Sequence, residues 1–226
     1  MQSERMFDGI APKYDRLNRV LSLGLDRGWR LAAIGALKRH APRHVLDIAC
    51  GSGDLALAAL KAGADRVTAA DPSVRMLELA AAKAVKRGLA SRIALLRAVA
   101  EDLPCADSSF DAVTVGFGVR NFADIGKGLG EMRRVLKPGG VAVILEFSRP
   151  RHFPVRSFHH LYLKNVIPLL GRLAAVNRAA CAYLAESILA FPDGDGFMAV
   201  LGRAGFSRLE CRRLTLGVCS VYTAVK

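Results

Sequence analysis

The sequence predicts an α/β fold in which a mostly parallel sheet is covered by helices on both faces. Apolar runs of strand length alternate with helical patterns from residue 44 to residue 147, and this alternation favours a parallel sheet. A glycine turn, Gly51-Ser-Gly53, joins the first strand to the next helix. Two more strands flank Gly217 near the end of the chain, and they predict an antiparallel hairpin.

The N-terminal region, residues 1–40, has a helical pattern. Asp26 is placed to cap a helix that carries an apolar stripe of Trp29, Leu31, Ile34 and Leu37. Pro42 ends this region, and the first strand follows at residues 44–49.

The next elements follow from glycine and proline signals. The sequence predicts helix 55–62 ending at Gly63, strand 66–71, a helix opened by Pro72 and Ser73 that ends at Gly88, strands 92–98 and 110–117, helix 124–136, a Lys137-Pro-Gly-Gly140 turn and strand 141–147. Residues 149–190 are helical with proline breaks, and helix 194–204 leads to strands 208–214 and 218–225. The sheet therefore has seven strands.

Composition limits the class of protein. The 226 residues are 52% hydrophobic and carry a net charge of +13, which suits one globular domain and excludes a disordered chain. No run approaches the roughly 18 apolar residues of a membrane span, and the start lacks the apolar core of a signal peptide. Five scattered cysteines without a CxxC motif indicate reduced thiols in a cytoplasmic protein and no metal site.

The glycine turn is the most informative stretch. Glycines between a strand and a helix let the backbone approach a ligand, and the free N–H groups of the helix start face it. Asp71 ends the next strand, where a carboxylate accepts hydrogen bonds from ribose hydroxyls. The pattern predicts a nucleoside site, although Gly51-x-Gly53-x-x-Ala56 also fits a loose dinucleotide fingerprint.

Three further features favour S-adenosylmethionine as the nucleoside. Asp47 lies in the first strand, where its carboxylate can meet a cationic amino-acid group, and Glu101 follows the third strand, within reach of an adenine amino group. Leu136-Lys-Pro-Gly-Gly140 precedes the fifth strand, and a helical segment and a hairpin follow it. This order is that of the class I methyltransferase fold, a Rossmann-like seven-stranded sheet with an antiparallel last strand.

Five longer stretches carry a family resemblance. They are Met6-Phe-Asp-Gly-Ile-Ala-Pro-Lys-Tyr-Asp-Arg-Leu-Asn18, Gly116-Phe-Gly-Val-Arg-Asn121, Arg134-Val-Leu-Lys-Pro-Gly-Gly140, Leu145-Glu-Phe-Ser-Arg-Pro150 and Tyr183-Leu-Ala-Glu-Ser-Ile188. With them, the sequence resembles the ubiquinone/menaquinone biosynthesis C-methyltransferases, the UbiE family, over nearly the whole chain. The resemblance implies methyl transfer from S-adenosylmethionine to a ring carbon of a polyprenylated quinol, foremost demethylmenaquinol, with a ubiquinol precursor as the other acceptor.

The resemblance also implies the residues that bind the methyl donor. They are Asp47, Gly51, Ser52, Gly53, Asp71, Pro72, Val99, Ala100, Glu101 and Gly116. Ser52 stands where the family has Thr, and Gly116 stands where some members have Ser. The chain departs further at Leu214-Thr-Leu-Gly217, in the region expected to cover the acceptor, so the identity of the quinol stays open.

Methylation of a ring carbon requires a phenolate on the neighbouring ring position. Arg120 follows the fourth strand, near the expected methyl donor, and its permanent charge suits stabilisation of a phenolate better than a role as base. Asn121 and Tyr14 can add hydrogen bonds to the ring oxygens. The alternatives are an ion pair of Arg120 with Asp124 or Asp15, and a packing role for Tyr14.

The sequence predicts one domain with four segments: a helical N-terminal segment, 1–40; a cofactor-binding core, 44–147; a basic helical lid over the acceptor, 149–190; and a C-terminal helix and hairpin, 194–226. Between residues 147 and 185 there is no acidic residue, and there are six basic ones: Arg149, Arg151, Arg156, Lys164, Arg172 and Arg178.

The basic lid predicts transient contact with an anionic membrane surface, which would place this cytoplasmic protein peripherally at the inner face of the cell membrane. The other interpretation is a solvated basic face. No nucleic-acid partner is expected, because the Asn/Asp-Pro-Pro-aromatic turn typical of base-amine methyltransferases is absent after the fourth strand. A different small aromatic acceptor remains an alternative, and the family resemblance suggests a homodimer.

Overall fold

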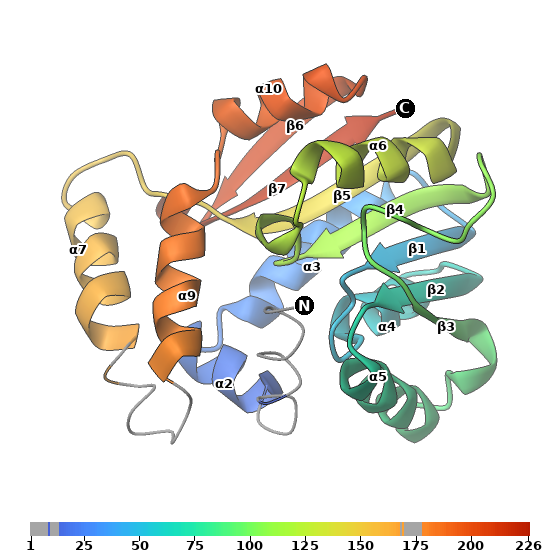
Figure 1. Cartoon of the computed structure of the whole chain (residues 1–226), viewed down its shortest axis with the longest axis horizontal. Helices are drawn as coiled ribbons and strands as arrows, with labels where there is room; N and C mark the ends of the chain where they lie inside the picture. The colour runs from blue at the N-terminus through green and yellow to red at the C-terminus, as the bar shows by residue number, and fades with distance from the viewer. Residues whose placement is uncertain (1–8, 10–13, 168, 170–177) are drawn as a thin grey trace.

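The computed structural model describes residues 9, 14–167, 169 and 178–226 (Figure 1). Residues 6–8 and 10–13 of the first family stretch lie outside the described residues, and so does Arg172 of the lid segment. Within the described part of the chain, no helix has the length and apolar content needed to cross a membrane.

Seven strands form one sheet in the order β3-β2-β1-β4-β5-β7-β6. They are β1 His44–Ile48, β2 Arg66–Asp71, β3 Ile93–Arg97, β4 Phe110–Gly116, β5 Leu136–Phe147, β6 Ser207–Leu214 and β7 Cys219–Val225. β1 to β5 run parallel, whereas β7 lies antiparallel between β5 and β6. This arrangement confirms the predicted seven-stranded sheet with its antiparallel last strand.

Helices cover both faces of the sheet, as Figure 1 shows. The helices of the described residues are α2 Tyr14–Leu21, α3 Asp26–Lys38, α4 Asp54–Lys61, α5 Val74–Lys86, α6 Ile125–Val135, α7 Val155–Leu161, α9 Arg178–Ala190 and α10 Asp195–Arg203. Single turns are η2 Ala90–Arg92, η3 Val119–Asn121, the π-helical η4 Tyr162–Val166 and η5 Thr215–Gly217.

Two hydrophobic clusters form the core, one on each face of the sheet. Val45 packs with α3 and α4, while its neighbour Leu46 packs with α6 and α10, because successive strand side chains point to opposite faces. The remaining helices α2, α7 and α9 lie beyond the sheet (Figure 1). α2, α9 and η4, the turn that follows α7, meet in a third cluster around Leu163, Ile167 and Ile188.

Several predicted helix ends are confirmed. The Ser73 hydroxyl accepts a hydrogen bond from the Met76 amide at 3.1 Å and caps α5. Gly63 and Gly88 follow α4 and α5 with positive φ, the conformation typical of the residue after a helix C-terminus.

Asp26 is not the cap that the sequence predicts. The N-cap position belongs to Leu25, and Asp26 lies in the first turn of α3, where its carboxylate accepts from the Ser22 hydroxyl and pairs with Arg30. The predicted apolar stripe of α3 is wrong at one position, since Leu31 is 69% exposed.

The Lys137–Gly140 turn is also corrected. β5 begins at Leu136, opposite Phe110, and the pairing resumes at Val141 opposite Ala112. The intervening residues therefore bulge out of a strand and do not precede it. A Cβ atom at Gly140 would lie 2.9 Å from the Lys137 carbonyl oxygen and 3.0 Å from that of Asp111, so the bulge requires glycine here.

We expect Gly140→Ala to destabilise the protein by about 1–3 kcal/mol, because the two carbonyl groups are backbone and cannot move independently. Thermal unfolding measures the effect. Gly130→Ala is the matched control, since Gly130 lies in α6 with open space around its Cα, and it should stabilise the helix by up to about 1 kcal/mol. Equal melting temperatures for the two variants would contradict the assignment of a tight bulge.

Candidate active site

The glycine turn lies at the carboxyl end of β1, next to the place where the strand order reverses between β1 and β4. Gly51 and Gly53 adopt positive φ angles of 53° and 79°. A Cβ at Gly53 would lie 2.9 Å from the Cβ of Ala80, so α5 can approach the turn only because the residue is glycine.

Asp71 fastens this turn to the start of α5. One carboxylate oxygen accepts from the Gly51 amide at 2.8 Å and the other accepts from the Ser73 amide at 2.9 Å. Both carboxylate oxygens thus hold backbone amides at the edge where the strand ends. Asp71 is 7% exposed and lines a cavity of about 170 Å³.

That cavity brings together most of the predicted nucleoside-binding residues. Besides Asp71, it is lined by Gly51, Pro72, Val99, Ala100, Glu101 and Gly116. Glu101 has a structural partner as well, because its Oε1 accepts from the amides of Ala123 at 2.6 Å and Asp124 at 3.2 Å. Its carboxylate therefore anchors the segment that leads into α6.

A smaller cavity of about 50 Å³ lies beside it and contains Asp47, Ser52 and Gly116. Asp47 is fully buried, and its Oδ1 accepts from the Thr114 hydroxyl at 2.6 Å. Its Oδ2 has no hydrogen-bond partner. Burial raises the pKa of Asp47 to about 7, against the opposing effect of hydrogen bonds from Thr114 and the Ala56 amide.

The unpartnered Oδ2 fits the ammonium group of S-adenosylmethionine, because a buried carboxylate is stabilised by a cation. Gly53 does not line either of these two cavities; it contributes through the close approach of α5. Ser52 faces α2, where its hydroxyl donates to Asp15 at 2.5 Å and accepts from Lys83 at 2.8 Å.

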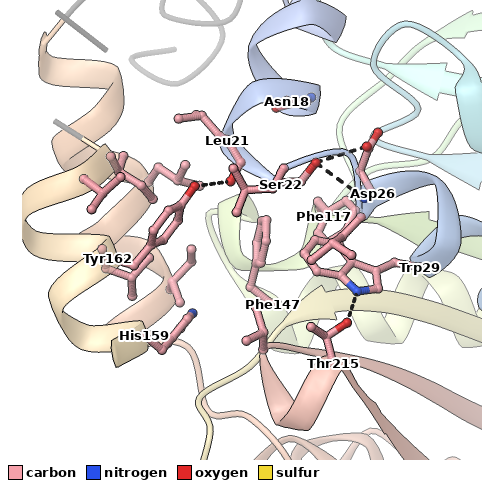
Figure 2. A pocket seen from close by; sticks show the side chains of 18 of the residues that line it. Asn18, Leu21, Ser22, Asp26, Trp29, Phe117, Phe147, His159, Tyr162 and Thr215 are labelled. Atoms are coloured by element: carbon pink, nitrogen blue, oxygen red, sulfur yellow. Dashed lines mark hydrogen bonds between the residues drawn. The ribbon is translucent and has the colours of Figure 1, made fainter. Parts of the chain in front are cut away.

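The largest of the three cavities described, about 490 Å³, lies between α2, α3, α7 and α9. Its wall is mostly apolar and aromatic, and Figure 2 shows several of its polar groups turned toward protein partners. Tyr162 donates its hydroxyl to the Leu21 carbonyl at 2.7 Å, and Trp29 Nε1 donates to the Thr215 hydroxyl at 2.8 Å. These bonds leave an apolar interior suited to a lipophilic ligand.

Tyr14 and Phe117 line all three cavities. They therefore mark the junction between the cofactor side and the large cavity. Tyr14 is partly buried, and desolvation raises the pKa of its phenol. Phe117 packs against Phe147 and Trp29, with ring centroids 4.6 Å and 6.0 Å away, so an aromatic wall lines the junction.

Arg120 lines the large cavity, while its neighbour Asn121 lines the nucleoside cavity. The two ion-pair partners that the sequence suggested for Arg120 are wrong. Its guanidinium pairs with the buried Glu146, with Nη1 and Oε1 2.8 Å apart. Asn121 Oδ1 accepts from the Tyr183 hydroxyl at 3.0 Å.

Asp124 and Asp15 have other roles. Asp124 caps α6 by accepting from the Lys127 amide at 3.0 Å. Asp15 pairs with Lys83 at 2.5 Å and so ties α2 to α5.

Sequence reasoning missed Glu146, Phe117 and Tyr183 as site residues. A lone carboxylate inside the apolar run Val141-Ala-Val-Ile-Leu-Glu-Phe147 was the available signal for Glu146, since such a residue is buried only with a partner. Across the described residues, no group of three or more histidine, cysteine, aspartate or glutamate side chains is arranged to hold a metal.

The chain matches the model of the ubiE/COQ5 methyltransferase family over residues 1–226. The chain belongs to this family. A demethylmenaquinone methyltransferase from Bacteroides fragilis is 46% identical over 226 residues, which cover 100% of this chain and 92% of the relative. A ubiquinone/menaquinone biosynthesis C-methyltransferase, UbiE, from Geotalea daltonii is 44% identical, with 99% of this chain and 95% of the relative covered.

Solved structures share the fold at lower identity. A SAM-dependent methyltransferase from Thermotoga maritima has a TM-score of 0.67 at 21% identity, covering 98% of this chain and 99% of that one. One from Aquifex aeolicus has a TM-score of 0.57 at 20% identity, covering 85% and 88%. These findings confirm the family, the class I methyltransferase fold and the S-adenosylmethionine dependence that the sequence predicts.

The pKa of Asp47 gives a testable pH dependence. Because only the carboxylate form attracts an ammonium group, we expect the affinity for S-adenosylmethionine to fall as the pH drops through about 7, by up to about tenfold per pH unit. Asp47→Asn should abolish this dependence and weaken binding by roughly 10- to 100-fold above that pH. Isothermal titration calorimetry at several pH values measures both effects.

Asp65→Asn serves as the control, because Asp65 is an exposed carboxylate far from the cavities that pairs only with Arg43 among the described residues. It should bind the methyl donor like the unaltered protein. Binding by Asp47→Asn that still weakens with falling pH would refute the assignment.

Proposed function

We propose that the protein transfers the methyl group of S-adenosylmethionine to a ring carbon of a polyprenylated quinol, foremost demethylmenaquinol. One of the relatives named above is called a demethylmenaquinone methyltransferase, and the other is called a ubiquinone/menaquinone biosynthesis C-methyltransferase. The observation that carries the proposal is the apolar cavity of about 490 Å³, which meets the cofactor cavities at Tyr14 and Phe117. A lipophilic aromatic ring fits such a cavity.

Different residues around the two smaller cavities bind different parts of the methyl donor. Asp47 holds its amino group, Asp71 accepts from its ribose hydroxyls, and the backbone and side chains from Val99 to Glu101 surround its base. When bound, the cofactor supplies an electrophilic methyl group. The aromatic wall of Trp29, Phe117 and Phe147 excludes water from the junction, so that the methyl group reaches carbon and not solvent.

Arg120 stabilises the phenolate that makes the ring carbon nucleophilic. The quinol hydroxyl loses a proton to water, and the electron density moves onto the neighbouring ring carbon. When the donor is bound, a carbon–methyl bond would form as the methyl–sulfur bond breaks and the sulfur keeps the electron pair. The ring proton would then pass to water, which restores the aromatic system. The guanidinium keeps its proton throughout, so it stabilises charge and does not act as a base. Tyr14 and Asn121 orient the ring and the donor at the junction.

Substitution of Arg120 tests this mechanism. Arg120→Ala should lower kcat by roughly 100- to 1000-fold, the usual effect of removing one group that stabilises an anion. The affinity for S-adenosylmethionine, measured by calorimetry, should stay within about twofold, because Arg120 lines only the large cavity.

The assay follows methylation of demethylmenaquinol by mass spectrometry. Arg120→Lys keeps the charge and loses the fork of donors, so it should recover part of the lost rate. Near-normal turnover by Arg120→Ala would remove this role. No methylation of demethylmenaquinol by the unaltered protein would remove the proposed acceptor, and a demethylated benzoquinol is then the next substrate to test.

The mouth of the large cavity supports a peripheral position on an anionic membrane. Leu23, Phe158 and Leu161 line the cavity and are 73%, 69% and 53% exposed, so they surround its opening. Exposed apolar groups around a lipid-binding cavity favour contact with acyl chains. A long prenyl tail can then pass from the cavity into lipid without exposure to water.

Part of the charge that predicted this membrane contact is neutralised within the chain. Arg149 pairs with Asp193 and Arg151 pairs with Asp195, each at 2.8 Å. Arg156 and Lys164 are exposed, and neither pairs with a carboxylate among the described residues. We therefore assign the attraction to anionic lipid to these two side chains in the lid segment.

Flotation with vesicles tests the membrane contact. The variant Arg156→Gln/Lys164→Gln should bind vesicles of phosphatidylglycerol and phosphatidylcholine roughly tenfold or more weakly than the unaltered protein, since each basic residue contributes about 1 kcal/mol. Phe158→Ser should weaken binding further. Val85→Ser is the matched control, because Val85 is equally exposed at 69% but lies on α5.

Undiminished binding by the charge variant, or equal binding to vesicles of phosphatidylcholine alone, would contradict the proposal. A position at the inner face of the cell membrane follows if the contact is confirmed. The predicted homodimer stays a prediction that light scattering can test.

A further inference from the structure

Glu146 is a buried carboxylate in an apolar strand. It lies near the end of β5, between Leu145 and Phe147, and its exposed fraction is 0%. An ionised carboxylate in such surroundings requires strong partners. Glu146 does not line the large cavity, whereas Arg120 and Phe147 do.

Both oxygens of Glu146 are bound to the segment that carries Arg120. Oε1 accepts from Arg120 Nη1 at 2.8 Å and from the Phe147 amide at 2.9 Å. Oε2 accepts from the backbone amide of Arg120 at 3.3 Å. The carboxylate therefore holds the side chain and the main chain of the same arginine.

The rest of the guanidinium is fixed as well. Nη1 also donates to the Phe117 carbonyl at 2.5 Å, Nε donates to the Ser187 hydroxyl at 3.3 Å, and the group lies over the Phe147 ring, 5.2 Å from its centroid. The hydrogen bonds described for Arg120 leave Nη2 without a partner in the described part of the chain. Nη2 is therefore the donor that stays available to a ligand in the cavity that Arg120 lines.

Stability alone does not account for this pair. Burying a guanidinium and a carboxylate costs solvation free energy that their attraction only roughly balances, and apolar residues of equal volume often stabilise a protein more. The pair also lies at the wall of the acceptor cavity, with the positive partner facing the cavity and the negative partner shielded inside the sheet.

We propose that Glu146 is a positioning residue for methyl transfer: it fixes the guanidinium of Arg120 so that its remaining donors face the quinol oxygen. This inference rests on the phenolate-stabilising role proposed for Arg120. A guanidinium held in place before the reaction stabilises the developing anion without reorganisation, and the benefit disappears when the side chain can turn away.

Glu146→Gln is the decisive variant. Glutamine has nearly the same shape, but one of its two terminal groups is a donor, so it faces either Arg120 Nη1 or the Arg120 amide with the wrong polarity. We expect kcat to fall at least about tenfold, with the KM for S-adenosylmethionine within about twofold. Glu146→Asp keeps the charge and should recover part of the rate.

The pH profile separates positioning from a structural role. With a poorly placed guanidinium the phenolate is less stable, so the apparent pKa of the bound quinol rises. The acidic limb of the kcat profile of Glu146→Gln should therefore move to higher pH, and added alkali should recover part of the rate. A merely structural role would lower kcat equally at every pH.

A double-mutant cycle completes the test. If Glu146 acts through Arg120, Arg120→Ala/Glu146→Gln should be no slower than Arg120→Ala alone. Glu131→Gln is the matched control, because Glu131 also pairs with an arginine, Arg134, but lies on α6 and lines none of the three cavities.

The outcomes distinguish this inference from the proposed function. Full turnover by Glu146→Gln beside an inactive Arg120→Ala overturns the positioning role and leaves the role of Arg120 intact. Full turnover by Arg120→Ala overturns both the proposed role of Arg120 and the positioning role of Glu146. A loss of rate by Glu146→Gln that is the same at every pH, or that adds to the loss in Arg120→Ala, also overturns the inference.

Discussion

Three carboxylates buried toward the carboxyl ends of parallel strands constrain the rest of this structure. Asp47 on β1, Asp71 on β2 and Glu146 on β5 are 0%, 7% and 0% exposed. A carboxylate out of water must find donors or a cation, or take up a proton. The parallel sheet brings the three to one edge, and the elements around that edge supply the groups that satisfy them.

The three carboxylates are satisfied to different degrees, and the difference indicates what each one does. Asp71 is held by backbone amides and so shapes the glycine turn before any ligand arrives. Glu146 is held by a guanidinium and two amides. Asp47 accepts hydrogen bonds from the Thr114 hydroxyl and the Ala56 amide, but its Oδ2 has no partner. It is therefore the one carboxylate of the three whose full satisfaction requires a cation from a ligand, which agrees with its raised pKa.

Local patterns in the sequence were sufficient to predict the order of the helices and strands, the glycine turn and the cap at Ser73, because each of these depends on residues a few positions apart. The contacts that the sequence could not predict join distant residues. Arg120 and Glu146 are 26 positions apart, and charge alone made the nearer Asp124 an equal candidate. Asp26 fails as a cap for a different reason: Ser22 and Arg30, each four positions away, bind its carboxylate, and the pattern of residue types did not rank these local partners above the cap. The family resemblance supplied the residues proposed to bind the cofactor, whereas no local pattern predicted the large apolar cavity between α2, α3, α7 and α9.

Backbone strain at Phe117 is best understood from its place at the junction of the three cavities. Its φ of 58° is unusual for a residue with a large side chain and costs about 1–2 kcal/mol. The amide of Phe117 donates to the Leu145 carbonyl at 2.7 Å, and its ring packs against Phe147 and Trp29; these contacts offset the cost. In this conformation Phe117 lines all three cavities. In the proposed reaction the methyl donor and the acceptor meet at this junction, which must stay dry for methyl transfer to carbon. Under that proposal the strained conformation serves the reaction, and the packing of the aromatic wall maintains it.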